Sequence, residues 1–176
     1  GAGDGHKYIG IPVDRDALEQ KGIKIRLDKN PVSLAPGITT SGEIALDNDF
    51  ERVGAEFYLK NGDDFTADTL ADDRALILDT AKGLVVVLGC SHRGVINTLN
   101  HVTQIAGRKT IHAILGGLHL GKASDEKLSK IIDHLRAFDL EKIGVGHCTG
   151  PKAFVALANA FGAKVFLNTV GNVIEF

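Results

Sequence analysis

Three short motifs in the second half of the sequence each place a histidine just after an apolar run that ends in glycine. The histidines are His92, His119 and His147. Such apolar runs are typical of buried strands, and open α/β sheets gather their ligands at the carboxyl ends of strands. Neutral imidazole nitrogen suits zinc, iron and similar metals. One histidine alone would more readily be a strand cap or a loop contact, but the repeated pattern favours a metal site, where bound water becomes a nucleophile near neutral pH.

Two cysteines lie close to these histidines in the sequence. Cys90 precedes His92 by two residues, and Cys148 directly follows His147. Thiolates bind zinc and iron well, and a nearby metal lowers the pKa of a thiol. Free cysteine is also a common small core residue, so core filling is the alternative. Two cysteines are too few for a disulfide scaffold, and thiol redox chemistry is disfavoured because no C-x-x-C occurs.

Acidic residues precede one of the apolar runs. Asp72 and Asp73, and less strongly Asp68, come just before residues 75–80. Carboxylates placed there could bind a metal or orient a histidine that does, although acidic loops are often merely solvated. Thr149 opens a helix that continues through Pro151, and free N–H groups at a helix start could hold a phosphate or carboxylate.

The remaining histidines lack the strand–glycine–histidine pattern. His101 and His134 fall on predicted helices, where we expect them on the surface, and His112 falls at the start of a predicted strand. We assign none of these a role, and His6 lies outside any motif.

The elements that must position the motifs are clearest after residue 74. Residues 75–80 and 84–89 predict a hairpin of two buried strands, and further apolar runs predict strands at 111–115, 143–145 and 164–167. Between them, apolar residues spaced three or four apart predict helices over 95–105, from the N-cap Ser124 to Phe138, and from Pro151 to Phe161. This strand–helix alternation after a hairpin predicts an α/β layered half-sandwich.

The first third of the chain is rich in turn signals. Alternating apolar and polar residues over 23–27 predict a half-buried strand after a short helical turn that ends at residues 18–22. A second strand is predicted over 37–44. The pair Asn61-Gly62 predicts a tight hairpin turn after residues 57–60.

Length and composition are those of one globular domain over residues 1–176. The net charge is −2, and no basic run or stripe points to a nucleic-acid partner. The longest apolar run, about 83–89, is too short to span a membrane, and no signal peptide is recognisable, so a cytoplasmic location is expected. The chain contains no methionine, and residues 1–5 predict no element, so we expect a fragment or a processed chain.

The chain resembles the metallo-β-lactamase superfamily. It is most similar to the branch of 7,8-dihydropterin-6-methyl-4-(β-D-ribofuranosyl)aminobenzene-5′-phosphate synthases and related "β-lactamase superfamily II" metal-dependent hydrolases. Six stretches carry the resemblance, with Gly-Cys-Ser-His and Gly-His-Cys-Thr-Gly the sharpest pair: residues 8–12, 40–44, 72–76, 83–92, 116–120 and 146–150.

The resemblance implies an αββα sandwich that holds one or two metals, usually zinc, at one sheet edge, with iron or manganese as other candidates. The superfamily's opening motif, T-H-x-H-x-D-H, normally precedes residue 8, and no H-x-H pair occurs in this sequence. The chain therefore matches mainly the C-terminal half of the sandwich, and the alternative to a bound divalent metal is that this chain alone binds none.

The resemblance also implies roles for individual residues. His147 matches the last histidine of the superfamily, a ligand of the second metal. His92, or else Cys90, takes the place of the bridging aspartate, and Asp73 stands where a further ligand is expected. The supporting or substrate-contacting residues implied at the same edge are His119, Asp72, Cys148 and Thr149.

Two functional hypotheses follow. The leading one is a metal-dependent hydrolase-like protein in which activated water attacks a phosphoester, a pyrophosphate or a similar small molecule, with a pterin-related substrate suggested by the branch. Its activity would depend on the first metal motif being supplied elsewhere. The rival is a non-catalytic fragment or assembly domain whose exposed sheet edge promotes a homo-oligomer such as a dimer.

Overall fold

The computed structural model describes residues 5–176. It contains nine strands, four α-helices and three short 3₁₀ turns within that range. The strands are β1 (Ser33–Ala35), β2 (Ile38–Thr40), β3 (Tyr58–Asn61), β4 (Asp64–Ala67), β5 (Ala75–Thr80), β6 (Gly83–Leu88), β7 (Ile111–Gly116), β8 (Lys142–Val145) and β9 (Val165–Leu167). The helices are α1 (Arg15–Gln20), α2 (Val95–Ala106), α3 (Asp125–Leu135) and α4 (Gly150–Phe161), with 3₁₀ turns η1 (Arg136–Phe138), η2 (His147–Thr149) and η3 (Gly162–Lys164).

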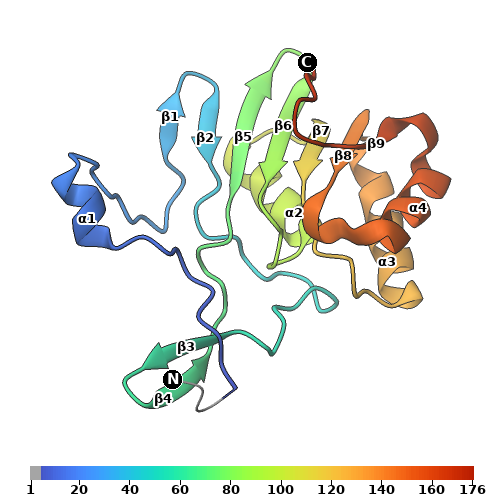
Figure 1. Ribbon diagram of the computed structural model, residues 1–176. Coiled ribbons are helices and arrows are strands. Elements are labelled where there is room, and N and C mark those ends of the chain that lie inside the picture. The colour runs from blue at the N-terminus through green and yellow to red at the C-terminus, as the bar shows by residue number, and fades with distance from the viewer. Residues whose placement is uncertain (1–4) are drawn as a thin grey trace.

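Seven strands form one mixed sheet in the order β1-β2-β5-β6-β7-β8-β9. The pairs from β1 to β6 are antiparallel, and those from β6 to β9 are parallel. The helices α2, α3 and α4 lie on one side of this sheet, as Figure 1 shows. The fold is therefore the predicted α/β half-sandwich, with one helical layer over a sheet.

The main core lies between the sheet and this helical layer. Val95, Leu99 and Leu157 are fully buried on the helices, and they pack with sheet residues such as Ile114 and Ile143. The other face of the sheet has a smaller apolar cluster around Val85 and Ala113. The C-terminal tail after β9 crosses this face (Figure 1), where Ile174 packs against the cluster. The two faces are therefore covered unequally.

Most predicted elements from residue 57 onward are confirmed. The Asn61-Gly62 turn joins β3 to β4, which form a separate two-stranded hairpin. Ser124 caps α3, because its hydroxyl accepts a hydrogen bond from the backbone N–H of Lys127. The predicted strand over 37–44 is shorter than expected and ends at Thr40.

The predicted strand over residues 23–27 is wrong. This segment forms no strand, and Ile23 and Leu27 are 48% and 83% exposed. Alternation of apolar residues produces a strand only where a neighbouring strand offers hydrogen-bonding partners, and the segment has none in the sheet order. The expectation that residues 1–5 form no element falls almost entirely outside the described residues.

Candidate metal centre

The three predicted motifs meet at one edge of the sheet. β6, β7 and β8 are parallel neighbours, so the loops that follow them emerge side by side. Backbone hydrogen bonds join these loops: Gly117 N–H donates to Gly89 O at 2.9 Å, and Gly121 N–H donates to Cys148 O at 3.1 Å. The buried Thr149 hydroxyl accepts from Leu118 N–H at 3.1 Å. Thr149, predicted as a supporting residue, thus ties two of the loops together.

Each of the three loops contains a non-glycine residue with a left-handed backbone. The φ values are 55° at Ser91, 49° at His119 and 51° at His147. Such conformations cost roughly 1–3 kcal/mol each and persist where surrounding contacts enforce them, most often at functional sites. Their occurrence in all three loops supports a functional role for this edge.

The first cluster at this edge consists of Cys90, His147 and Cys148. Their potential ligand atoms all lie within 4.8 Å of one another. The Cys148 thiol donates to the Cys90 carbonyl oxygen at 3.4 Å. Burial, together with the adjacent Cys148 thiol, raises the pKa of Cys90 to about 11. Both thiols are half-buried, whereas His147 is exposed, so the cluster opens to solvent on the imidazole side.

The second cluster is built around His92. Its ring lies 4.1 Å, centroid to centroid, from the His119 ring, and the Phe57 ring packs edge-on against it at 5.1 Å. The Nδ1 atom of His92 is buried and has no hydrogen-bond partner in the described part of the chain. Burial, and then the charge of His92, lower the pKa of His119. The two imidazole rings therefore lie against each other, and the buried Nδ1 atom of His92 lacks a hydrogen-bond partner among the described residues.

Asp73 lies beside both clusters. Its Oδ2 atom accepts a hydrogen bond from Arg93 N–H at 2.8 Å. Burial raises the pKa of Asp73, while its hydrogen bond with Arg93 and the charge of His92 oppose that rise. Asp73 also acts on the pKa values of Cys90 and His119. A carboxylate that influences both clusters is placed to assist a cation at either.

The other acidic candidates, Asp72 and Asp68, line a cavity rather than either cluster. Asp72 is exposed, and Asp68 is half-buried with its Oδ1 accepting from Leu70 N–H at 2.8 Å. Both line a cavity of about 1250 Å³ between the β3–β4 hairpin and residues 5–10. Phe57 lines the same cavity and contacts His92, so the cavity adjoins the second cluster.

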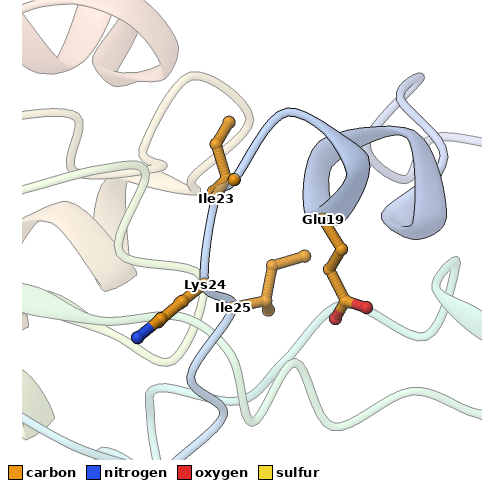
Figure 2. A pocket seen from close by; sticks show the side chains of 5 residues that line it. Glu19, Ile23, Lys24 and Ile25 are labelled. Carbon is orange, nitrogen blue, oxygen red and sulfur yellow. The ribbon is translucent and has the colours of Figure 1, made fainter.

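A smaller hollow of about 410 Å³ lies beside α1. Figure 2 shows Glu19, Ile23, Lys24 and Ile25 around it, all from one continuous stretch at the end of α1. This hollow contains no set of metal-binding side chains and shares no lining residue with the cavity near His92.

Several residues that shape the edge carry no recognisable signal in the sequence. The carboxylate of Glu51 is buried against the start of α2, directly after the His92 loop. Arg93 is also buried, with its guanidinium donating to Thr69 O at 2.9 Å and lying 3.6 Å from Glu43. No local pattern predicts these contacts, because each joins segments more than twenty residues apart.

The remaining histidines stand apart from the clusters. His112 is buried within β7, and His134 is exposed on α3, as expected. The expectation that His101 lies on the surface is wrong. It is half-buried, and its Nε2 atom lies 2.9 Å from Ser41 O, because α2 packs against the segment after β2.

Comparison with solved structures finds a metal-dependent hydrolase of the β-lactamase superfamily. The match has a TM-score of 0.78 and 26% identity, and it covers 87% of this chain and 58% of that one. Among curated proteins, a 7,8-dihydropterin-6-methyl-4-(β-D-ribofuranosyl)-aminobenzene-5′-phosphate synthase of Methanocaldococcus jannaschii is 32% identical over 169 residues. That match covers 92% of this chain and 56% of the synthase. In sequence and in fold, the chain is similar to proteins of the metallo-β-lactamase superfamily.

A second curated relative, an uncharacterised protein of the same organism, is 30% identical over 154 residues, which are 88% of this chain and 56% of that protein. No protein-family model matches the chain. The chain thus spans little more than half the length of the curated relatives that it matches. Among residues 5–176, no helix is long and apolar enough to cross a membrane.

Proposed function

We propose that this chain contributes part of the metal site of a hydrolase-like enzyme that acts on a small phosphoester or pyrophosphate-type molecule. The observation that carries the proposal is the buried, unpartnered Nδ1 atom of His92 at the edge where three strand-end loops meet. A buried polar atom without a partner is costly unless a ligand satisfies it. The name of the synthase relative supports a pterin-related substrate.

The proposed ligands are His92, His147, Asp73 and Cys90, which the structure distributes over the two clusters. Imidazole, carboxylate and thiolate together fit a divalent cation such as zinc, with iron and manganese as alternatives. Such a cation, when bound, supplies Lewis-acid activation of water near neutral pH. Asp73 would offset part of the positive charge, and its hydrogen bond from the Arg93 N–H holds its carboxylate in place.

The proposed supporting residues act around these ligands. Burial, and then the charge of His92, lower the pKa of His119 and so favour its neutral imidazole, which can accept a proton from a substrate or water. Asp72 borders the cavity of about 1250 Å³, which is large enough for a small-molecule substrate. Cys148 and Thr149 hold the loop after β8 against its neighbours.

Binding of manganese tests the His92 cluster, because Mn²⁺ prefers imidazole and carboxylate over thiolate. We expect Mn²⁺, followed by electron paramagnetic resonance, to bind the wild-type chain, and His92→Ala to weaken binding at least tenfold. His134→Ala removes an exposed imidazole on α3 and serves as the matched control. No binding to a folded wild-type chain would contradict a metal site in this cluster.

A specific observation also favours the alternative, a non-catalytic assembly domain. Several apolar side chains of the N-terminal third are exposed: Tyr8 by 80%, Ile9 by 69%, Ile11 by 75%, Leu27 by 83% and Leu34 by 60%. An exposed apolar surface of sufficient size marks a face that packs against another polypeptide. The relatives are longer than this chain, which supports packing against a further segment or a second copy.

Light scattering after size-exclusion chromatography tests this alternative. We expect the chain to form a dimer, and Ile9→Ser with Ile11→Ser to shift it toward the monomer. Lys7→Ser and Lys24→Ser, which change exposed polar residues, are the control. A monomer at all concentrations would count against homo-oligomeric assembly.

A further inference from the structure

We propose that one face of the β3–β4 hairpin is a stacking platform for a flat nitrogen heterocycle, which takes the place on Phe65 that the His6 ring now occupies. The platform consists of Tyr58, Lys60 and Phe65, and all three line the cavity of about 1250 Å³. The inference rests on the proposed function and deepens it, because it assigns the residues that hold the ring of the substrate. None of the proposed metal ligands lines this cavity.

The register of the hairpin places the platform side chains on one face. Tyr58 pairs with Ala67, and Lys60 pairs with Phe65. Side chains directly opposite each other on paired strands, and those two residues apart on one strand, lie on the same face. The Lys60 Nζ atom accordingly lies 5.7 Å from the centre of the Phe65 ring. The hairpin stands apart from the main sheet, with the segment that leads to α1 beside it (Figure 1).

The His6 ring shows that this face accepts a flat nitrogen heterocycle. It stacks on Phe65 with the ring centroids 4.0 Å apart and 14° between the planes. The Tyr58 ring meets it edge-on, at 5.4 Å and 85°. Stacking on an aromatic side chain tolerates different rings, because every heterocycle presents a π face. The corner formed by Phe65 and Tyr58 therefore suits other flat heterocycles as well as imidazole.

His6 belongs to a segment that can withdraw from the platform. Residues 5–10 are exposed and form no helix or strand. Phe65, in contrast, lies on β4 and is held by the pairing with β3. A centroid spacing of 4.0 Å is already van der Waals contact, so no further ring fits between His6 and Phe65. A ligand ring must therefore displace His6.

The charges in the cavity favour a heterocycle that carries N–H groups and an anionic substituent. The lining includes Lys7 and Lys60 as cations and Glu56 and Asp72 as carboxylates. Ammonium groups pair with phosphate or carboxylate, and carboxylates accept N–H groups from a nitrogen heterocycle. A ring with both kinds of group matches this lining better than an apolar ring does.

Phe57 connects the platform with the His92 cluster. It directly precedes β3, and it lines the same cavity as the platform. Its ring also packs edge-on against the His92 ring at 5.1 Å. A ring bound on Phe65 and a group that reacts beside His92 therefore belong to one continuous region of the chain.

Fluorescence anisotropy of pterin-6-carboxylate, a flat nitrogen heterocycle with one anionic substituent, tests the platform. The full chain is titrated in EDTA, so that metal ions take no part. We expect saturation at one probe per chain. Phe65→Leu should weaken binding about tenfold or more, because stacking is lost. Phe176→Leu, which changes an exposed ring beside His112, should leave binding unchanged. His6→Ala should strengthen binding about twofold or more, because it removes the competing ring.

The ring protons of His6 provide a second measurement that needs no variant. Since the His6 ring lies against Phe65, its NMR signals should move when the probe displaces it, whereas those of His134 should not. No saturable binding to the folded wild type, unchanged binding in Phe65→Leu, weaker binding in His6→Ala, or unmoved His6 signals would each overturn the proposal. Manganese binding is measured without the probe, so failure of the metal site and failure of the platform are distinguished.

Discussion

The side chain of Glu51 caps helix α2 from a distant loop, and Asn97 completes the arrangement. The Glu51 carboxylate accepts the backbone N–H of Asn97 at 2.8 Å and that of Ile96 at 3.1 Å. The side-chain amide of Asn97 in turn accepts the N–H groups of Asp47 and Asn48. This pair holds the segment before β3 against the start of α2, immediately after the His92 loop.

Replacing Glu51 should destabilise the fold strongly. Glu51→Ala leaves two helix N–H groups without an acceptor, and charged hydrogen bonds contribute roughly 1.5–3 kcal/mol each. We expect a loss of about 2–4 kcal/mol in the free energy of unfolding, measured by urea denaturation. Asp49→Ala, an exposed change in the same loop, should cost less than about 0.5 kcal/mol. Equal losses for the two variants would show that the cap contributes little.

The proximity of His92 and His119 predicts a coupled titration. Burial, and then the His92 charge, lower the pKa of His119 below the ordinary value of 6.5. In the metal-free chain, His92→Gln should raise the pKa of His119 toward 6.5, as followed by the ring proton signals in NMR. His134→Gln should leave it unchanged. A His119 titration that is insensitive to His92→Gln would argue against the contact.

The lowered pKa of His119 also makes the free energy of unfolding depend on pH. Because the folded chain binds the His119 proton less readily than the unfolded chain does, this residue favours folding above pH 6.5. That contribution is lost as the pH falls from the pKa of His119 in the unfolded chain toward its lower pKa in the folded chain. His119→Gln should therefore reduce the dependence of unfolding free energy on pH in the acidic range.

Gly117 and Gly89 form a matched pair for testing the packing of the loops. A Cβ atom at Gly117 would lie 2.7 Å from the Cys148 sulfur, whereas one at Gly89 would meet nothing within 4 Å. Gly117→Ala should cost about 1–3 kcal/mol through overpacking, while Gly89→Ala should change stability by less than about 1 kcal/mol. Thermal unfolding measures both, and similar effects of the two changes would contradict the close approach.

Arg93 should not be replaceable by lysine. Its buried guanidinium donates to Thr69 O and faces Glu43, and a single ammonium cannot reproduce two such directions. We expect Arg93→Lys to cost about 2 kcal/mol or more in urea denaturation, because a buried charge loses partners. Arg52→Lys, at an exposed position nearby, should be almost neutral. If Arg93→Lys is also neutral, the contacts of the guanidinium are dispensable.

The agreement between sequence and fold differs along the chain for a physical reason. From residue 75 onward, apolar periodicity and capping residues such as Ser124 are local signals, and local signals fix the type and the order of elements. Residues 23–27 carry an equally regular alternation but form no strand. Alternation records only which side chains could be buried, whereas a strand also requires a neighbour to accept and donate its hydrogen bonds.

In the candidate site, too, the sequence predicted some features, and others depend on contacts between distant segments. The sequence alone determined that His92, His119 and His147 follow strands and that Cys90 and Cys148 lie next to two of them. Only the tertiary structure decided the grouping, in which His92 faces His119 and His147 lies with the two thiols. Strand order and loop backbone set that grouping, and Glu51 and Arg93 support it through contacts between distant segments. Residue spacing along a chain carries no information on such contacts.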